Sequence, residues 1–379
     1  MFTDKSKFGM AFDYGGAWIH SASRHPIFPL AQEWHFTLQY QNEAEIDRAF
    51  YNGHKLDDKD MARLQEADNK IIKDIGALAR QKDTATSEVL PPHPSQAERI
   101  AATFIGPMDA AVDLRWLSTA DYAGFASPEP NFLVKEGFGT IYERYGKDLP
   151  VMLNKRVRAI QYDDKGVRVL MAGDQIAARA VIVTVSTGVL ASGTIGFSPP
   201  LPTATNAAID ALPMGLLTKV PMQVRDRTKF DLKPGSNVVL ERDGLDDAYL
   251  LAFPFDSDLL VGFIGGDFAW QKSKEGNDGG KAATIEFMRD TVRQSFGNDA
   301  ANAIALTDVT DWATNPLTLG AYSAARPGHA DARKALAEPL DNRVFLAGEA
   351  MGEDLSQTSA GAMLSGTATA ARVHRALGA

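Results

Sequence analysis

The stretch that decides the fold runs from Asn342 to Val373 and reads NRVFLAGEAMGEDLSQTSAGAMLSGTATAARV. Its first part, Arg343–Leu346, is a short apolar run that predicts a buried strand. Gly348 and Glu349 end that run, with a small residue that lets a ligand approach the backbone and a carboxylate beside it. The pattern therefore predicts a strand and a tight turn at the edge of an α/β domain.

The second part of the stretch predicts a helix that begins near Ser359. Residues 356–358 offer hydroxyl side chains that can cap its first turn. The helix is rich in Ala, Gly, Ser and Thr, so its backbone can lie close to whatever packs on it. Its N-terminus carries unpaired N–H groups and partial positive charge, which suits an anion. An ordinary strand–loop–helix without a ligand is the alternative.

Length and composition indicate a globular protein of two domains. The chain has 379 residues, of which 45% are hydrophobic and 23% are charged. Its net charge of −9 argues against a nucleic-acid or anionic-membrane partner. No apolar run is long enough to span a bilayer, and residues 1–16 lack a signal-peptide core. A cytoplasmic protein is expected, with a periplasmic or secreted protein as the alternative if the true N-terminus lies upstream. The chain contains no cysteine, which excludes disulfides and cysteine metal sites or nucleophiles.

The segment FLAGEAMGEDLSQTSAGAMLSG resembles the C-terminal FAD-binding segment of the flavin amine oxidases. That family includes monoamine, polyamine and L-amino-acid oxidases and the flavin histone demethylases. The resemblance implies that Gly348 and Glu349 meet the ribityl–pyrophosphate part of FAD. It implies that Thr358 and Ser359, at the helix start, meet the pyrimidine edge of the flavin. Because the chain has no cysteine for a thioether link, the FAD is expected to be bound non-covalently.

A second resemblance lies near the N-terminus, in FDYGGAWIH at 12–20. The double glycine predicts a tight turn or close backbone approach to a flat ligand. The family has a similar stretch along the flavin ring, and a histidine at the place of His20 faces substrate in animal polyamine oxidases. An ordinary glycine turn and a structural histidine are the alternatives. The residues expected to contact the flavin here are Gly15, Gly16, Ala17 and Trp18.

One part of the family pattern is not in this sequence. The family begins with a strand, a GxGxxG turn, a helix and a ribose-binding glutamate, and the turn places a helix N-terminus on the pyrophosphate. The nearest string here, at 137–139, has different spacing and lies elsewhere in the chain. Three explanations stay open: a truncated chain or misplaced start, a separate subunit that supplies the unit, and a protein that does not bind flavin. A homodimer is also left open.

The middle of the chain predicts alternating helices and strands. Residues 40–130 are helical in pattern, with an amphipathic helix over 61–78 and a second over 97–104. Short β-rich runs follow at 151–153, 157–162 and 167–171, with a turn at 163–166. The aliphatic run 180–185 predicts a parallel strand buried on both faces. The resemblance implies that the backbone of Val157 meets adenine.

Two further segments resemble the substrate side of the family. In 195–224, Lys219 lies on a predicted strand, where a lone lysine is ordinarily solvated. The resemblance instead implies a buried lysine that holds a water against flavin N5, with a depressed pKa. In 310–328, the string WATNPLTLGAYS implies that Trp312 and Tyr322 flank the flavin and the substrate pocket, with core aromatics in a turn as the alternative.

Together these segments predict a mixed α/β fold of two domains. An FAD-binding domain, Rossmann-like but without its N-terminal βαβ unit, would comprise 1–36, 132–197 and 338–379. A substrate-binding domain, with a mixed sheet and helices, would comprise 37–131 and 198–337.

The predicted reaction is FAD-dependent oxidation of a small-molecule amine to an imine, with oxygen reduced to hydrogen peroxide. Lys219, His20, Trp312 and Tyr322 are the expected catalytic residues, and no metal is expected. Monoamine oxidases flank the amine with two tyrosines, but the corresponding positions here are Phe345 and Thr358. A polyamine, amino-acid or alkaloid-amine substrate is therefore favoured. A related flavin oxidoreductase with another substrate or electron acceptor, and a flavin-free subunit, are the alternatives.

Overall fold

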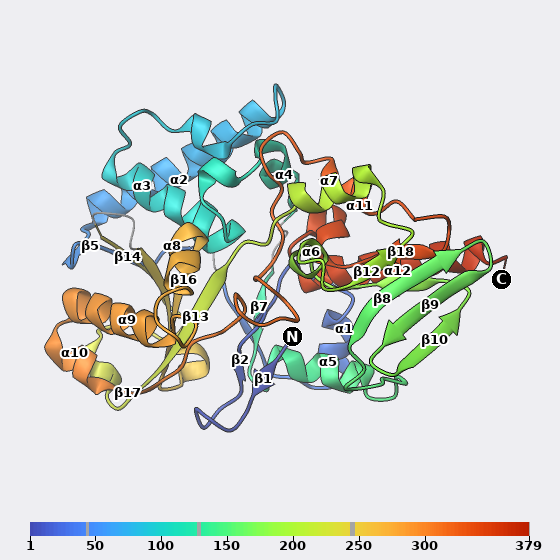
Figure 1. The fold of residues 1–379 in the computed structure, drawn as a ribbon. Coiled ribbons are helices and arrows are strands. Elements are labelled where there is room, and N and C mark those ends of the chain that lie inside the picture. Colours follow the sequence, from blue (N-terminus) through green and yellow to red (C-terminus); the bar gives the residue numbers. More distant parts are fainter. Residues whose placement is uncertain (43–44, 127–129, 243–246, 379) are drawn as a thin grey trace.

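The computed structural model describes residues 1–42, 45–126, 130–242 and 247–378. In Figure 1 a large sheet with its helices lies on the left, and a group of smaller sheets with the C-terminal helix lies on the right. The N-terminal strands run between the two groups. Within the described ranges, no helix combines the length and the apolar character needed to cross a membrane.

The large sheet has seven strands and is buried on both faces. Neighbouring strands pair antiparallel, except that β5 runs parallel to β14. Val238, Leu240 and Leu250 face one core, whereas Val239 and Leu251 face the other, which explains the nearly continuous apolar runs. In order across the sheet the strands are β17 (Ile304–Thr307), β13 (Leu217–Val224), β16 (Leu259–Gly265), β15 (Ala248–Ala252), β14 (Asn237–Glu241), β5 (Arg48–Tyr51) and β6 (His54–Lys55).

Helices cover both faces of this sheet. On one face α2 (Asp58–Ala79) buries Leu64, Ile71 and Ile75, as its three-and-four spacing predicts. Beside it, α3 (Gln96–Thr103) begins with a capping box between Ser95 and Glu98. The other face is covered by α9. The remaining helices of this half are α4 (Thr119–Gly124), α8 (Gly266–Lys272), α9 (Lys281–Phe296) and α10 (Asn298–Ala303).

The prediction of a purely helical stretch at 40–130 was wrong at its start, where β5 and β6 extend the sheet. Phe50 is buried in the strand and packs against the core under α9. Four residues are too few to show a strand by alternation, so the pairing with β14 decides their conformation.

The second half contains two separate sheets. A four-stranded sheet has the order β10 (Asp174–Ala178), β9 (Gly166–Met171), β8 (Val157–Asp163) and β12 (Gly196–Ser198). A parallel pair joins β11 (Val181–Val183) to β18 (Val344–Leu346), which confirms the predicted parallel strand. Burial on both faces was wrong for β11, where Val183 is buried but Val181 and Ile182 are partly exposed. The helices here are α6 (Thr187–Ala191), α7 (Thr203–Ala211), α11 (Ala332–Leu336) and α12 (Ser359–Ala376).

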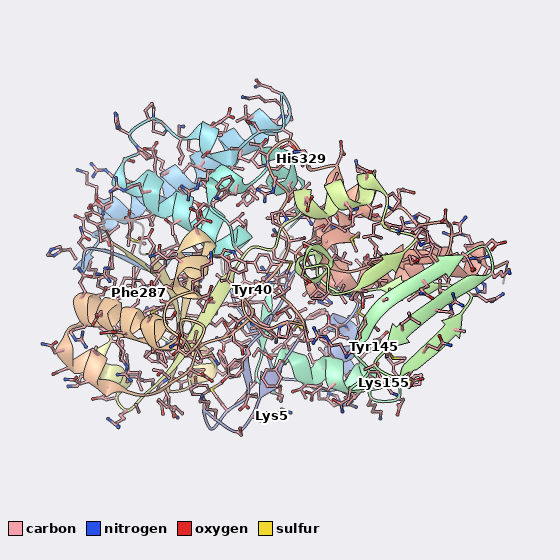
Figure 2. The ribbon with its side chains drawn as sticks, viewed as in Figure 1. Lys5, Tyr40, Tyr145, Lys155, Phe287 and His329 are labelled. Atoms are coloured by element: carbon pink, nitrogen blue, oxygen red, sulfur yellow. The ribbon has the colours of Figure 1, made fainter. Side chains whose placement is uncertain are left out.

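The predicted strand at 151–153 is absent from the structure. This run lies between Tyr145 and Lys155, which Figure 2 labels, and its side chains are exposed: Leu153 is 77% exposed. A β-rich run becomes a strand only when a neighbour accepts its backbone hydrogen bonds, and none does so among the described residues.

Short N-terminal elements join the two halves. The strands β1 (Thr3–Asp4) and β2 (Phe12–Asp13) form a hairpin. A three-stranded sheet has the order β3 (Trp18–Ile19), β7 (Phe132–Val134) and β4 (Leu38–Tyr40). Two helices, α1 (Phe28–Glu33) and α5 (Phe138–Gly146), pack against it through Ile27, Phe138 and Ile141. This arrangement places 13–20 between β13 of the large sheet and the start of α12.

Candidate active site

Lys219 is the centre of the site. It lies on β13, opposite Phe263 of β16, and only 7% of its surface is exposed. Its ammonium donates to the backbone carbonyls of Asp13, at 2.9 Å, and Gly15. The Nζ atom also lies 5.6 Å from the ring centre of Trp18 and 5.9 Å from that of Phe263. Burial lowers the pKa of Lys219 to about 8, although the nearby Asp13 acts in the opposite direction. The buried lysine implied by the resemblance is therefore present.

Asp13 supplies one of the two carbonyls that bind Lys219, and its side chain is itself held by hydrogen bonds. Its carboxylate accepts the N–H groups of Phe138, at 2.8 Å, and Gly139, at 3.2 Å, at the start of α5. It also accepts the hydroxyl of Thr3. Burial raises the pKa of Asp13, while these hydrogen bonds act against that rise. The sequence analysis did not single out Asp13, and its place directly before Tyr-Gly-Gly at the end of a strand is the signal that was available.

Gly15 and Gly16 form a stretch of backbone without side chains, called the glycine strip below, which lies against Trp312. The indole N–H of Trp312 donates to the carbonyl of Tyr14 at 2.8 Å, and a Cβ atom added at Gly15 would lie 3.6 Å from its ring. Met1 covers another side, because its Sδ would lie 3.3 Å from a Cβ at Gly16. A flat ligand on this strip would therefore share it with Trp312 and displace Met1, which is 49% exposed.

Ala17, Trp18 and His20 continue from the strip. Ala17 and Trp18 pack against the core that includes Phe263. The indole N–H of Trp18 is buried and lacks a hydrogen-bond partner within the described part of the chain. His20 stacks on Trp18 with ring centres 6.0 Å apart, and its proximity also affects His25. These contacts extend the site from Lys219 toward the first turn of α12.

The Gly348–Glu349 turn follows β18. Gly348 has φ of 151°, and a Cβ there would meet only the tip of Met351, so the turn has open space beside it. Glu349 accepts the Ser323 backbone N–H at 3.1 Å and the Ser323 hydroxyl at 3.0 Å. Burial raises the pKa of Glu349, whereas Arg333 and these hydrogen bonds act in the opposite direction.

The first turn of α12 carries Thr358 and Ser359. The Thr358 hydroxyl accepts the N–H of Gly361 at 3.1 Å, which confirms the predicted cap. Ser359 lies 3.0 Å from Nε2 of His25. Because Nδ1 of His25 accepts the N–H of Ile27, the neutral ring carries its proton on Nε2 and donates to Ser359. Burial, and then His20, lower the pKa of His25 to about 4, so the ring is neutral at physiological pH. The sequence analysis missed His25, which lies in an unremarkable HPIFP string.

Tyr322 and Val157 occupy two other places. The Tyr322 hydroxyl donates to the Asp109 carbonyl at 2.9 Å, and its own carbonyl accepts the N–H of Gly215. Tyr322 directly precedes Ser323, so it adjoins the Glu349 turn. Val157 begins β8 opposite Met171 and packs at the edge of the core that contains Leu346 and Ala350, on either side of the Gly348–Glu349 turn. The contacts above thus join Lys219, Gly15, Trp18 and Trp312 in one group, with His20 stacked on Trp18. Tyr322 and Val157 lie with the Glu349 turn instead.

The residues present fit one end of a flavin dinucleotide. A side-chain-free strip at Gly15–Gly16, a tryptophan beside it and a helix N-terminus suit a flat ring with a polar edge. The buried unpaired N–H of Trp18 is a further donor in this region. The string at 137–139 does not serve as a phosphate cradle: a Cβ at Gly137 would meet Thr3, and the N–H groups of Phe138 and Gly139 already bind Asp13.

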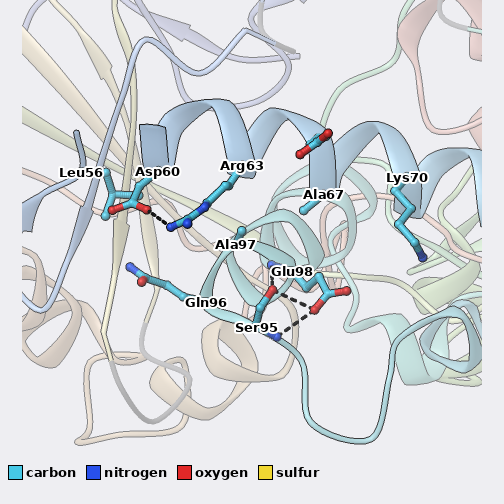
Figure 3. Close-up of a pocket in the computed structure, with 10 residues that line it drawn as sticks. Leu56, Asp60, Arg63, Ala67, Lys70, Ser95, Gln96, Ala97 and Glu98 are labelled. Atoms are coloured by element: carbon cyan, nitrogen blue, oxygen red, sulfur yellow. Dashed lines mark hydrogen bonds and ion pairs between the residues drawn. The ribbon is translucent and has the colours of Figure 1, made fainter. Parts of the chain in front are cut away.

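A surface groove lies elsewhere, between α2 and α3, with a volume of about 520 Å³ (Figure 3). Most of its charged side chains already have partners: Arg63 pairs with Asp60, Lys70 pairs with Asp74, and Glu98 binds Ser95. No residue predicted from the sequence as part of the site lines it. The groove is therefore separate from the chemistry around Lys219.

The chain is similar to known proteins over most of its length. Residues 101–374 match the model of a family described as flavin containing amine oxidoreductase. A probable polyamine oxidase 4 from Arabidopsis thaliana is 26% identical over 98% of this chain and 79% of its own length. A lysine-specific histone demethylase 1 homologue from the same plant is 28% identical over 68% of this chain, which spans only 16% of that relative.

Solved structures show the same fold. A putrescine oxidase bound to putrescine superposes with a TM-score of 0.79 at 17% identity, covering 99% of this chain and 90% of that one. Cyclohexylamine oxidase from Brevibacterium oxydans IH-35A gives a TM-score of 0.77 at 19% identity, covering 100% and 91%. The predicted mixed α/β fold is thereby confirmed over the full length.

Proposed function

This chain belongs to the flavin containing amine oxidoreductase family, and from that premise we propose that it is an FAD-dependent oxidase of a small-molecule amine. The observation that carries the proposal is the buried Lys219, which lies beside the glycine strip and Trp312 on the substrate side of the fold. We assign residues 1–36, 132–197 and 338–379 to FAD binding, and residues 37–131 and 198–337 to the substrate side.

FAD, when bound, supplies the acceptor for the hydride that the amine loses from its α-carbon, and oxygen then regenerates it. The chain's own residues position the flavin ring and stabilise the negative charge that develops on it. Gly15 and Gly16 allow the backbone to lie against a flat ring, and Trp312 bounds one side. The first turn of α12 presents N–H groups that precede its first intrahelical hydrogen bond, so it stabilises negative charge placed there.

Lys219 handles a proton in this proposal. With its pKa lowered to about 8, the ammonium exchanges a proton far more readily near neutral pH than an ordinary lysine does. Two of its N–H groups bind carbonyls, which leaves one for a water in the site. His20 and Tyr322 are proposed to face the substrate, and Glu349 to bind the ribityl chain with the acceptor capacity that Ser323 leaves.

The substrate class is proposed from the relatives and from the site together. The polyamine oxidase relative and the putrescine-bound structure both act on or bind aliphatic amines, as their names state. Phe345 is fully buried in β18, so it is not available as one wall of a tyrosine-type aromatic cage. An aliphatic di- or polyamine is therefore the first class to test, ahead of aromatic monoamines.

The test begins with the purified chain and added FAD. We expect the visible absorbance of bound flavin, bleaching on anaerobic addition of an aliphatic amine, and peroxide in air. Lys219→Met should retain bound flavin and lower turnover by about 100-fold, within the usual range for loss of a positioned proton-transfer group. Lys233→Met, on an exposed lysine, is the matched control. Turnover with a dye acceptor but without peroxide would point to another electron acceptor. A chain that binds no FAD would overturn the proposal.

A further inference from the structure

Arg333 is a buried arginine outside the predicted site, and all of its N–H groups are used. It lies on α11 and is 7% exposed. Its guanidinium donates two hydrogen bonds to the carboxylate of Asp121 on α4, from Nε at 2.6 Å and from Nη2 at 2.9 Å. The remaining three go to the Ser323 hydroxyl, the Ser323 carbonyl and the Ala350 carbonyl, at 3.0–3.1 Å. These five hydrogen bonds use all five N–H donors of the guanidinium.

Ser323 connects this ion pair to Glu349. Its hydroxyl accepts from Nη1 of Arg333, so its own proton is directed to the Glu349 carboxylate, which lies 3.0 Å away. The Ser323 backbone N–H donates to the other carboxylate oxygen. Ser323 is fully buried, which keeps water from competing for these bonds. The result is a chain of contacts from Asp121 through Arg333 and Ser323 to Glu349.

Few other charges face Glu349. The helix α12, which packs against its turn, carries no charged residue from Ser359 to Ala371. The other cation on α11, Lys334, is 87% exposed and pairs with Asp331, and Asp354 in the following turn pairs with Arg24. The Gln357 backbone N–H is a further neutral donor to Glu349. Among the described residues, Arg333 is thus the charge that acts on this carboxylate.

We propose that Arg333 and Asp121 are positioning residues for Glu349: through Ser323 they hold its carboxylate in place beside the Gly348 turn. Because the same contacts hold Ser323, they also fix the backbone that presents Tyr322. The consequence for a cofactor, tighter binding of its ribityl chain, rests on the proposed function. The network itself does not rest on it.

The charges explain why both Arg333 and Asp121 are needed to hold Glu349. Burial alone raises the pKa of Glu349, and the positive charge of Arg333 opposes that rise. Without Asp121, Arg333 would lose the carboxylate that binds it directly and would bury two N–H groups without an acceptor, so Asp121 permits Arg333 to be there. A neutral Glu349 would lose part of its charge-assisted hydrogen bonding to Ser323 and hold the turn less firmly.

The first experiment uses no flavin. Glu349→Gln is introduced into the wild-type chain and into Asp121→Asn/Arg333→Met, and melting temperatures are compared at neutral pH. We expect Glu349→Gln to lower the melting temperature of the wild type and to raise that of the double variant, because there it removes an unpaired buried carboxylate. A merely structural role predicts the same sign in both backgrounds, and that result would overturn the proposal.

The second experiment covers the case in which the double variant does not fold. Arg333→Lys keeps the charge but cannot make five bonds, and Lys334→Met is the matched control on the same helix. FAD affinity is measured by flavin fluorescence for Arg333→Lys, Glu349→Gln and their combination. We expect each to weaken binding about 10-fold, with the combination no weaker than either alone. Additive losses would overturn the proposal. If the wild type binds no FAD, the proposed function fails, and the first experiment still decides the network.

Discussion

Lys219 and Arg333 are both 7% exposed, yet their surroundings are opposite. Lys219 binds two backbone carbonyls and lies among aromatic rings, with no carboxylate in ion-pair contact among the described residues. Arg333 is gripped by a carboxylate and satisfied on every N–H. The lysine therefore carries a charge that burial destabilises, whereas the arginine carries a fixed, compensated one.

This difference separates two tasks in one site. A group that exchanges protons must have a protonation state that is easily changed, and burial without a counter-ion provides that for lysine. A group that holds others in place must not change its charge, and a guanidinium bound on all sides meets that need. The following predictions test the contrast, from the largest expected effect to the smallest.

Removing the carboxylate of the compensated pair should cost the most. Asp121→Ala leaves Arg333 buried without the carboxylate that binds it directly, so we expect a loss of about 3–5 kcal/mol in the free energy of unfolding, measured in urea. Asp331→Ala, at the exposed pair with Lys334 at the start of α11, should change it by less than about 0.5 kcal/mol. A loss for Asp121→Ala as small as that of its control would contradict the contrast.

Lys219, which is buried without an ion-pair partner among the described residues, should make the free energy of unfolding depend on pH. Its folded pKa of about 8 lies below the ordinary 10.5, so the unfolded chain binds the proton more tightly. Stability from this residue therefore rises with pH, by about 2.5 kcal/mol between pH 7 and pH 10. Lys219→Met should lack that part of the rise in unfolding measurements across this range, whereas Lys233→Met should keep it. Parallel pH curves for wild type and Lys219→Met would refute the claim.

His25 extends the same rule to a second buried base. Its folded pKa of about 4 lies below the ordinary 6.5, so the stability it contributes is present above pH 6.5 and is lost on acidification. We expect a loss of about 2 kcal/mol between pH 7 and pH 5, which His25→Gln should abolish. The exposed His329, labelled in Figure 2, supplies the control His329→Gln. An unchanged acid limb in His25→Gln would show that the ring is not buried and neutral.

Partly exposed charges should matter least. Tyr14 donates to Asp308 at 2.6 Å, next to the carbonyl that holds Trp312, and Lys7 binds the same carboxylate oxygen. Tyr14→Phe should lower the free energy of unfolding by about 1–2 kcal/mol, because a hydrogen bond to a charged group is lost. Lys7→Ala should cost less than about 1 kcal/mol, since its side chain is 38% exposed. A larger loss of stability for Lys7→Ala than for Tyr14→Phe would mean that the salt bridge, and not the phenol hydrogen bond, stabilises the contacts around Asp308.

Much of the fold could be read from the sequence, because its strongest patterns are local. The helix at 58–79, the hairpin of β15 and β16 and the strand before Gly348 follow from periodicity and turn residues. The failures at 48–51 and 151–153 have one cause. A short β-rich run takes its conformation from a partner strand, and the sequence of the run does not show whether that partner is there.

The sequence by itself determined the family resemblance, the strand–turn–helix at 342–373 and the placing of Lys219 on a strand. Only the tertiary structure decided that this lysine is buried, with no ion-pair partner in the part of the chain that the structure describes, and that Asp121, Arg333 and Ser323 meet at Glu349. Asp121 and Arg333 are 212 positions apart in the chain. A pKa or an ion pair depends on which groups lie within a few ångströms, and that proximity is created by packing, not by local sequence.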